Sequence, residues 1–144
     1  MATVSALLAL GDPQATSDDL SALLDLADSQ ISYRQRYLTG IARVPVIDLI
    51  ALDPGNPRGI AFQVAAIAAH LEALPRLSDD GLAEPQQALA RELAAMVATA
   101  QAASFGRDQL LAIDNKLVDL SNAVARRYFL HGSEPLRAAG LVVG

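Results

Sequence analysis

The chain has 144 residues, no cysteine and a net charge of −5. This length suits one domain with a sizeable core, and the lack of cysteine excludes a disulfide framework, a thiol nucleophile and a thiolate metal site. The negative charge, without any basic run, argues against nucleic acid as a partner. Hydrophobic residues make up 52% of the chain and aromatic residues only 4%, so alanine and leucine dominate the apolar content and favour helices.

Two helices are predicted before residue 40. Residues 2–10 form a short apolar helix that Gly11 and Pro13 close. Thr16 or Ser17 can cap a longer helix over residues 17–38, which Gly40 ends. Apolar side chains recur along this longer helix at three- and four-residue steps: Leu20, Leu23, Leu24, Ala27, Ile31 and Leu38.

The middle of the chain predicts a short helix over residues 45–52, a turn over residues 53–56 and a long helix over residues 57–74. Asn56 followed by Pro57 is a strong start signal for the long helix. Because this helix is apolar nearly all round, we expect it to be central. Few helices are available to cover two apolar faces, so we also expect self-association or docking of another helical unit.

Two more long helices follow. Pro75 ends the central helix, a polar loop covers residues 76–83, and helices are predicted over residues 85–103 and 107–130, with Gly106 between them. The pattern shows no strand-like alternation and no repeat. The expected fold is all-α, an antiparallel bundle of about four longer helices and two short ones. Residues 1–131 form one domain, and residues 132–144 are expected to be a flexible tail.

Arg34 is the first candidate site residue. At 100° per residue it falls within the apolar arc of the predicted helix, so we expect it to be buried and paired with a carboxylate. Asp114 lies on the apolar stripe of the last helix and is the first expected partner, with Asp48 or Asp53 second. The functional alternative is an arginine that binds an anion in a cleft.

A second hypothesis groups polar residues near the central helix start into a ligand site. An arginine beside a helix N-terminus can bind phosphate or carboxylate. The more ordinary interpretation is a plain helix cap, with Arg58 stacking on Phe62. The candidate ligand-binding residues are Arg34, Arg36, Tyr37, Asp53, Asn56 and Arg58.

No pattern in the sequence predicts catalysis or a cofactor. The segment GNPRG lacks the spacing and the lysine of a P-loop, and no GxSxG elbow is present. His70 and His131 are far apart and have no second ligand at helical spacing. We therefore expect no catalytic residue, no metal and no cofactor, which favours a non-enzymatic role and leaves an enzyme half-site as the alternative.

The same sequence bears on location. No apolar run reaches the roughly 18 residues of a membrane span. The first residues lack the basic region of a signal peptide. We therefore expect a soluble cytoplasmic protein without membrane contact.

Three segments carry a family resemblance: SYRQRYLTG, PVIDLIALDPGNPRGIAFQ and LLAIDNKLVDLSNAVARRYF. Together they resemble the bacterial alpha-E family over residues 20–129. The chain is most similar to the C-terminal helical portion of versions fused behind a circularly permuted ATP-grasp domain. The family's Glu-Arg motif lies in its N-terminal half and has no equivalent here, nor is an ATP-grasp domain present. The chain therefore resembles half of an alpha-E domain.

The resemblance implies a context for the function. Such domains occur beside ATP-grasp ligase and transglutaminase-like domains, in systems that make or process peptide tags. The expected function is a non-catalytic interaction or scaffold domain. Its expected partners are an N-terminal alpha-E half, an ATP-grasp or transglutaminase-like protein, or a second copy. The alternative is half of an enzyme or of an anion- or peptide-binding pocket, completed by the missing half and using Arg34, Arg36 and Arg58.

Overall fold

The structure is a computed structural model that describes residues 14–76 and 84–130. The helix predicted over residues 2–10, the centre of the loop over 76–83 and the tail over 132–144 lie outside the described residues. All described elements are helical, which confirms the all-α fold. In chain order they are α2 (Ser17–Leu26), α3 (Gln30–Arg36), α4 (Arg43–Ile47), the π-helix η1 (Asp48–Leu52), α5 (Ile60–Ala73), α6 (Pro85–Thr99), α7 (Arg107–Ala125) and the π-helix η2 (Arg126–Leu130).

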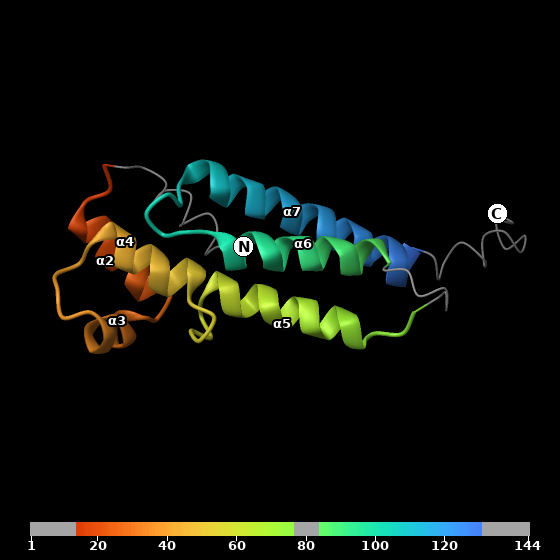
Figure 1. The fold of residues 1–144 in the computed structure, drawn as a ribbon, viewed down its shortest axis with the longest axis horizontal. Coiled ribbons are helices and arrows are strands. Elements are labelled where there is room, and N and C mark those ends of the chain that lie inside the picture. Colours follow the sequence, from red (N-terminus) through yellow and green to blue (C-terminus); the bar gives the residue numbers. More distant parts are fainter. Residues whose placement is uncertain (1–13, 77–83, 131–144) are drawn as a thin grey trace, which may run out of the picture.

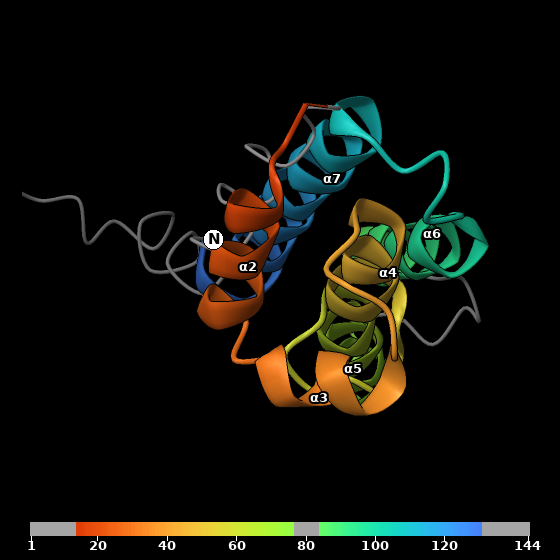
Figure 2. The ribbon, with the colours of Figure 1, turned by 90° about the vertical axis from the view of Figure 1, so that its left-hand side faces the viewer.

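The three longest helices run side by side in alternating directions (Figure 1). α6 packs against both α5 and α7, whereas α2, α3, α4 and η1 gather at one end of this trio. Viewed along the bundle, α2 and α6 lie on opposite sides, with α7 above and α5 below (Figure 2). Among the described residues, α2 therefore packs at the end of the trio, against α3 and α4, and no fourth helix runs along α5, α6 and α7.

A single core joins all these helices. Its least exposed aliphatic side chains come from α2, α4, η1, α6 and α7: Leu24, Val46, Ile50, Leu93 and Ile113. The apolar stripe of α2 packs inward as predicted, since Leu20 and Leu23 are each only 3% exposed. Burying such leucines contributes about 2 kcal/mol each relative to leaving them in water.

The prediction of one helix over residues 17–38 is wrong. α2 ends at Leu26, Asp28 adopts φ +49°, and α3 begins at Gln30. Ser29 fixes this break, because its N–H donates to the Leu24 carbonyl at 2.8 Å and its hydroxyl donates to the Ala27 carbonyl at 2.9 Å. Aspartate tolerates the left-handed region better than most residues, so the chain breaks here without a glycine or a proline.

The break changes which side chains face the core. Ile31 is 73% exposed, whereas Tyr33, which a continuous helix would turn away from the core, is buried at 2%. The Tyr33 hydroxyl donates to the Gly40 carbonyl and accepts from the Ala42 N–H, both at 3.1 Å. The tyrosine thus anchors the segment that leads into α4.

The short helix predicted over residues 45–52 is confirmed as α4 followed by η1, but the central helix begins later than predicted. Gly59, not Asn56, is the residue that precedes α5 as its N-cap. A Cβ on Gly59 would lie 2.9 Å from the Ile50 carbonyl oxygen. Only glycine therefore allows the start of α5 to approach η1 this closely.

A nearly buried ion pair closes the other end of the bundle. Arg127 Nε donates to Glu84 Oε2 at 3.1 Å, and the two side chains are 15% and 9% exposed. Arg127 Nη2 also donates to the Pro75 carbonyl at 3.3 Å. The pair therefore links the end of α5, the start of α6 and η2. A buried arginine–carboxylate pair is thus present as expected from the sequence, but it involves Arg127 and not Arg34.

Removing this arginine should destabilise the fold strongly. We expect Arg127→Met to lower the free energy of unfolding by about 3–5 kcal/mol, because it removes the guanidinium that neutralises the buried Glu84 carboxylate. Denaturant melts of Arg127→Met, Glu84→Gln and the double variant measure the coupling as a double-mutant cycle. The control is the exposed pair Lys116–Glu92 at 2.6 Å, where Lys116→Met should cost no more than about 1 kcal/mol. Equal costs at both pairs would contradict this role for Arg127.

Candidate functional site

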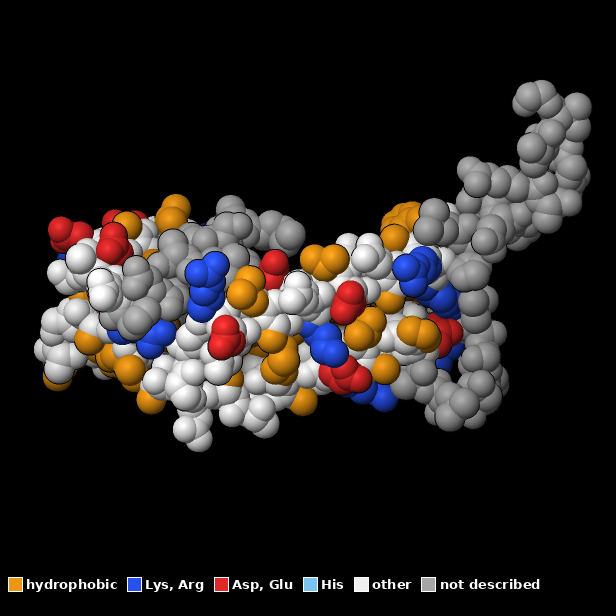
Figure 3. Space-filling model, turned by 90° about the horizontal axis from the view of Figure 1, so that it is seen from above, with side chains coloured by type: hydrophobic (Ala, Val, Ile, Leu, Met, Phe, Trp, Pro, Cys, Tyr) orange, Lys and Arg blue, Asp and Glu red, His pale blue; other side chains and the backbone are white. Residues whose placement is uncertain are grey.

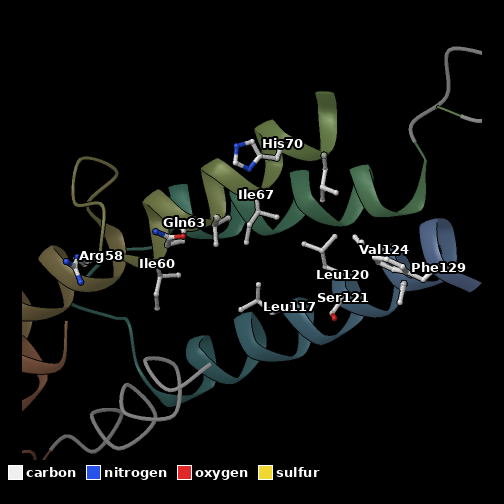
Figure 4. A pocket seen from close by; sticks show the side chains of 14 residues that line it. Arg58, Ile60, Gln63, Ile67, His70, Leu117, Leu120, Ser121, Val124 and Phe129 are labelled. Atoms are coloured by element: carbon white, nitrogen blue, oxygen red, sulfur yellow. The ribbon is translucent and has the colours of Figure 1, made fainter. Parts of the chain in front are cut away.

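A broad groove lies between α5 and α7, and we call it the α5–α7 groove (Figure 4). Its volume is about 690 Å³. α6 passes behind it in Figure 4, and the lining residues come from α5 and the turn before it, from α7 and from η2. The lining residues are Arg58, Gly59, Ile60, Gln63, Val64, Ile67, His70, Leu71, Leu117, Leu120, Ser121, Val124, Ala125 and Phe129.

Most of this lining is aliphatic. Gln63, His70 and Ser121 are its polar side chains apart from Arg58, which lies at one end. Phe129 marks the opposite end and is 74% exposed. The groove thus offers an apolar floor with a few polar groups, which is the common composition of a recognition surface.

α2 ends close to one end of the groove. Arg58 Nη2 lies 3.2 Å from Asp28 Oδ2, so the end of α2 meets the groove at its Arg58 end. In Figure 2, α2 is seen from the side and lies across this end of the bundle, next to α3 and α4. Beyond it, no described residue covers the apolar side chains of α5 and α7. The groove is an open, mainly aliphatic surface between two neighbouring helices, to which a further helix could bind.

Sequence reasoning did not find the groove residues, although it contained their signal. The central helix was predicted to be apolar on two faces. One face contributes Ile60, Val64, Ile67 and Leu71 to the groove. The other carries Phe62, which is 38% exposed, and the exposed Ala65 and Ala69, and it lies outside the groove. Figure 3, which views the molecule from above, shows further apolar side chains at its surface between charged ones. On α7, Leu111 and Val118 are 37% and 45% exposed.

Arg36 lies in a polar cluster with two aspartates at the other end of the molecule. Its Nη1 donates to Asp53 Oδ2 at 2.6 Å, and its Nη2 lies 3.5 Å from Asp48 Oδ2. The guanidinium also lies over the Tyr37 ring, 5.5 Å from its centroid. Two carboxylates already neutralise this arginine, so the cluster is poorly suited to capture an anion.

Tyr37 completes the cluster by donating its hydroxyl proton to Asp48 Oδ2 at 2.5 Å. Burial raises the pKa of the Tyr37 hydroxyl to about 12, and the hydrogen bond to Asp48 adds to the increase. The hydroxyl therefore stays protonated at neutral pH and acts as a donor. A smaller pocket of about 270 Å³ adjoins this cluster and is lined by Ser32, Gln35, Arg36, Leu49, Asp53, Gly55, Asn56 and Pro57.

Asn56 has a different role from the predicted helix cap. It is 7% exposed, and its Nδ2 donates to the Leu49 carbonyl at 2.9 Å and to Ser29 Oγ at 3.3 Å. Its Oδ1 accepts from the Arg58 N–H at 3.2 Å. One side chain thus ties the α2–α3 break to η1 and to the turn before α5.

Arg34 does not occupy the predicted position. It is exposed, and among residues 14–76 and 84–130 it has no salt bridge, with Asp114 or with any other carboxylate. The prediction counted 100° per residue from Leu20 along one continuous helix. The break at Asp28 interrupts that count, so Arg34 points in a different direction. The three candidate arginines do not converge: Arg36 is in the aspartate cluster, Arg58 is at the groove, and Arg34 faces solvent.

The described residues were also compared with the requirements of a metal site and of a membrane-spanning helix. No group of three or more His, Asp or Glu side chains within them is arranged to hold a metal ion. No helix among them has the length and hydropathy needed to cross a membrane.

The buried contacts of Asn56 lead to a stability prediction. Asn56→Ala should lower the free energy of unfolding by about 1–3 kcal/mol, because it leaves the Leu49 carbonyl without this donor in a buried site. The matched control is Gln63→Ala, which removes an exposed side-chain hydrogen bond to the Pro57 carbonyl and should cost within about 0.5 kcal/mol. Denaturant melts measure both values, and an Asn56→Ala effect as small as that of the control would contradict the role assigned to Asn56.

The comparisons with known proteins agree with the helical architecture. A family model described as a predicted alpha-helical domain with a conserved ER motif, Alpha-E, matches residues 1–129. No curated protein and no solved structure matches the chain. None of the four glutamates in the sequence is followed by arginine, so the dipeptide named in that description is absent from this sequence. Since the match spans nearly the whole chain, this protein belongs to the Alpha-E family.

Proposed function

We propose that this chain is a non-catalytic helical interaction domain whose α5–α7 groove receives a helix of a partner protein. The observation that carries the proposal is the groove itself, about 690 Å³ with a mainly aliphatic lining between α5 and α7 (Figure 4). Apolar surface of this kind on a protein commonly marks an interaction site. Filling it with an amphipathic helix would bury Ile67, Leu117 and Val124 as in an ordinary helix bundle.

The partner class is proposed from the family context. Because related domains occur with ATP-grasp ligases and transglutaminase-like proteins, the partner is a protein of a peptide-ligase or peptide-tagging system. An ATP-grasp protein encoded beside this chain is the first candidate. An N-terminal alpha-E half is the second candidate, and it would also bind the groove through one of its helices.

The alternative is an anion- or peptide-binding pocket built from Arg34, Arg36 and Arg58. The geometry supports it less well, because Arg36 is held by Asp53 and Asp48 and the other two arginines lie elsewhere. Arg58 is the member that retains a binding role in the proposal, since it lines the end of the groove.

A pair of arginine substitutions tests the proposed function. Ser121→Arg places a long charged side chain in the groove from an exposed position on α7 and should weaken binding of the neighbouring ATP-grasp protein at least tenfold. Asn115→Arg introduces the same side chain at an exposed position of α7 outside the groove and should leave affinity unchanged. Isothermal titration with purified proteins measures both. Equal affinities for the two variants would contradict a partner site in the groove.

A further inference from the structure

We infer that the partner helix bound by the α5–α7 groove is about three turns long, runs antiparallel to α5 and carries a carboxylate in its last turn that pairs with Arg58. This inference rests on the proposed function of the groove and specifies the chemistry of the partner. A single amphipathic helix with these features is sufficient for binding. The length of the groove, the direction of its two walls and its charge support the inference.

The length of the groove sets the length of the helix. On α5 the lining extends from Ile60 to Leu71, and on α7 and η2 it extends from Leu117 to Phe129. At a rise of 1.5 Å per residue, these two stretches are about 17 Å and about 18 Å long. A helix of about twelve residues has the same length, so it would contact the groove from end to end.

The direction of the helix follows from the two walls. α5 and α7 both pack against α6, which runs opposite to them, so the two walls are parallel to each other (Figure 1). Ile60 and Leu117 lie toward the Arg58 end of the groove, and Phe129 lies at the other end (Figure 4). A helix antiparallel to both walls brings its C-terminus to Arg58. The guanidinium attracts the partial negative charge of a helix C-terminus, and so favours this direction.

The charge of the groove comes from Arg58. Among the lining residues it is the one with a full positive charge, His70 is the other ionisable side chain, and none is acidic. The chain as a whole has a net charge of −5, so the groove differs from it in sign. A carboxylate at the Arg58 end of a bound helix complements this charge, whereas a lysine there would be repelled.

Arg58 is accessible to such a carboxylate. Among residues 14–76 and 84–130, its one salt bridge is to Asp28 at 3.2 Å, and the two side chains are 63% and 74% exposed. Exposed pairs of this kind are weak, so a carboxylate on a bound helix can share or replace Asp28. Arg36 differs, because two carboxylates already hold it.

Synthetic peptides test the inference on the full-length protein. The probe is a fluorescein-labelled helix of about twelve residues, with leucine and alanine on one face and glutamate in its last turn. One comparison peptide has lysine at that position, and another has the glutamate in its first turn. By fluorescence anisotropy, the probe should bind about fivefold more tightly than either. A first-turn glutamate stabilises the free helix better, so helix propensity alone predicts the opposite order for those two peptides.

Charge variants assign this preference to Arg58. Arg58→Gln should abolish the preference for glutamate over lysine, and Arg58→Glu should reverse it. Arg34→Glu is the matched control, because it makes the same charge change at an exposed arginine outside the groove and should leave the preference intact. Ser121→Arg should abolish binding of the probe, because it places a charged side chain in the groove.

Four results would overturn the inference: no binding of any peptide, equal binding of all three, tighter binding of the first-turn glutamate, or a preference that Arg58→Glu leaves unchanged. Failure of the proposed function looks different. Peptide binding that is lost in Ser121→Arg but is independent of the glutamate would refute the inference and leave the groove as a helix site. Selective binding of the probe without binding of the ATP-grasp protein would support the inference and refute that partner. Selective binding that persists in Ser121→Arg would refute both.

Discussion

The fold depends on the contacts of one buried asparagine. Asn56 reaches from the turn before α5 to the Ser29 hydroxyl and the Leu49 carbonyl, and so joins the break between α2 and α3 to the π-helix η1. An unsatisfied amide in this position would be costly, so these contacts specify one arrangement of the segments. With the break fixed, α2 stops beside Arg58 and cannot extend along α5 and α7.

The groove lies beyond that stop. The chain breaks at Asp28 and turns into α3, so that no described helix covers the apolar side chains between α5 and α7. The groove's aliphatic lining explains why α5 is apolar on more than the face it turns to α6. The chemistry of the site is therefore that of helix recognition, and the charged residues near it act at its edges.

Much of this architecture could be predicted from residue patterns, and the exceptions have physical causes. Proline and glycine punctuation located the starts of α6 and α7 well, because those residues restrict the backbone directly. The break at Asp28 was not predictable, because the sequence has neither proline nor glycine there. The break depends on an aspartate at φ +49° and on the hydrogen bonds of Ser29. The error has a further effect: a continuous helix turns Arg34 toward the core and Tyr33 away from it, the reverse of what the structure shows. To predict the groove one must know which helices are neighbours, and the periodicity of apolar residues within one helix does not give that information.

Nuclear Overhauser contacts from the Tyr33 ring test the central claim, the break at Asp28, most directly. The account predicts contacts from this ring to Gly40 and Ala42, an interruption of helical amide–amide connectivity at residues 27–29, and solvent-exposed Ile31 methyl groups. Unbroken helical connectivity from Ser17 through Arg36, with Ile31 in contact with the core and Tyr33 in solvent, would contradict it. That outcome would mean that residues 17–36 form one continuous helix and that the chain does not break at Asp28.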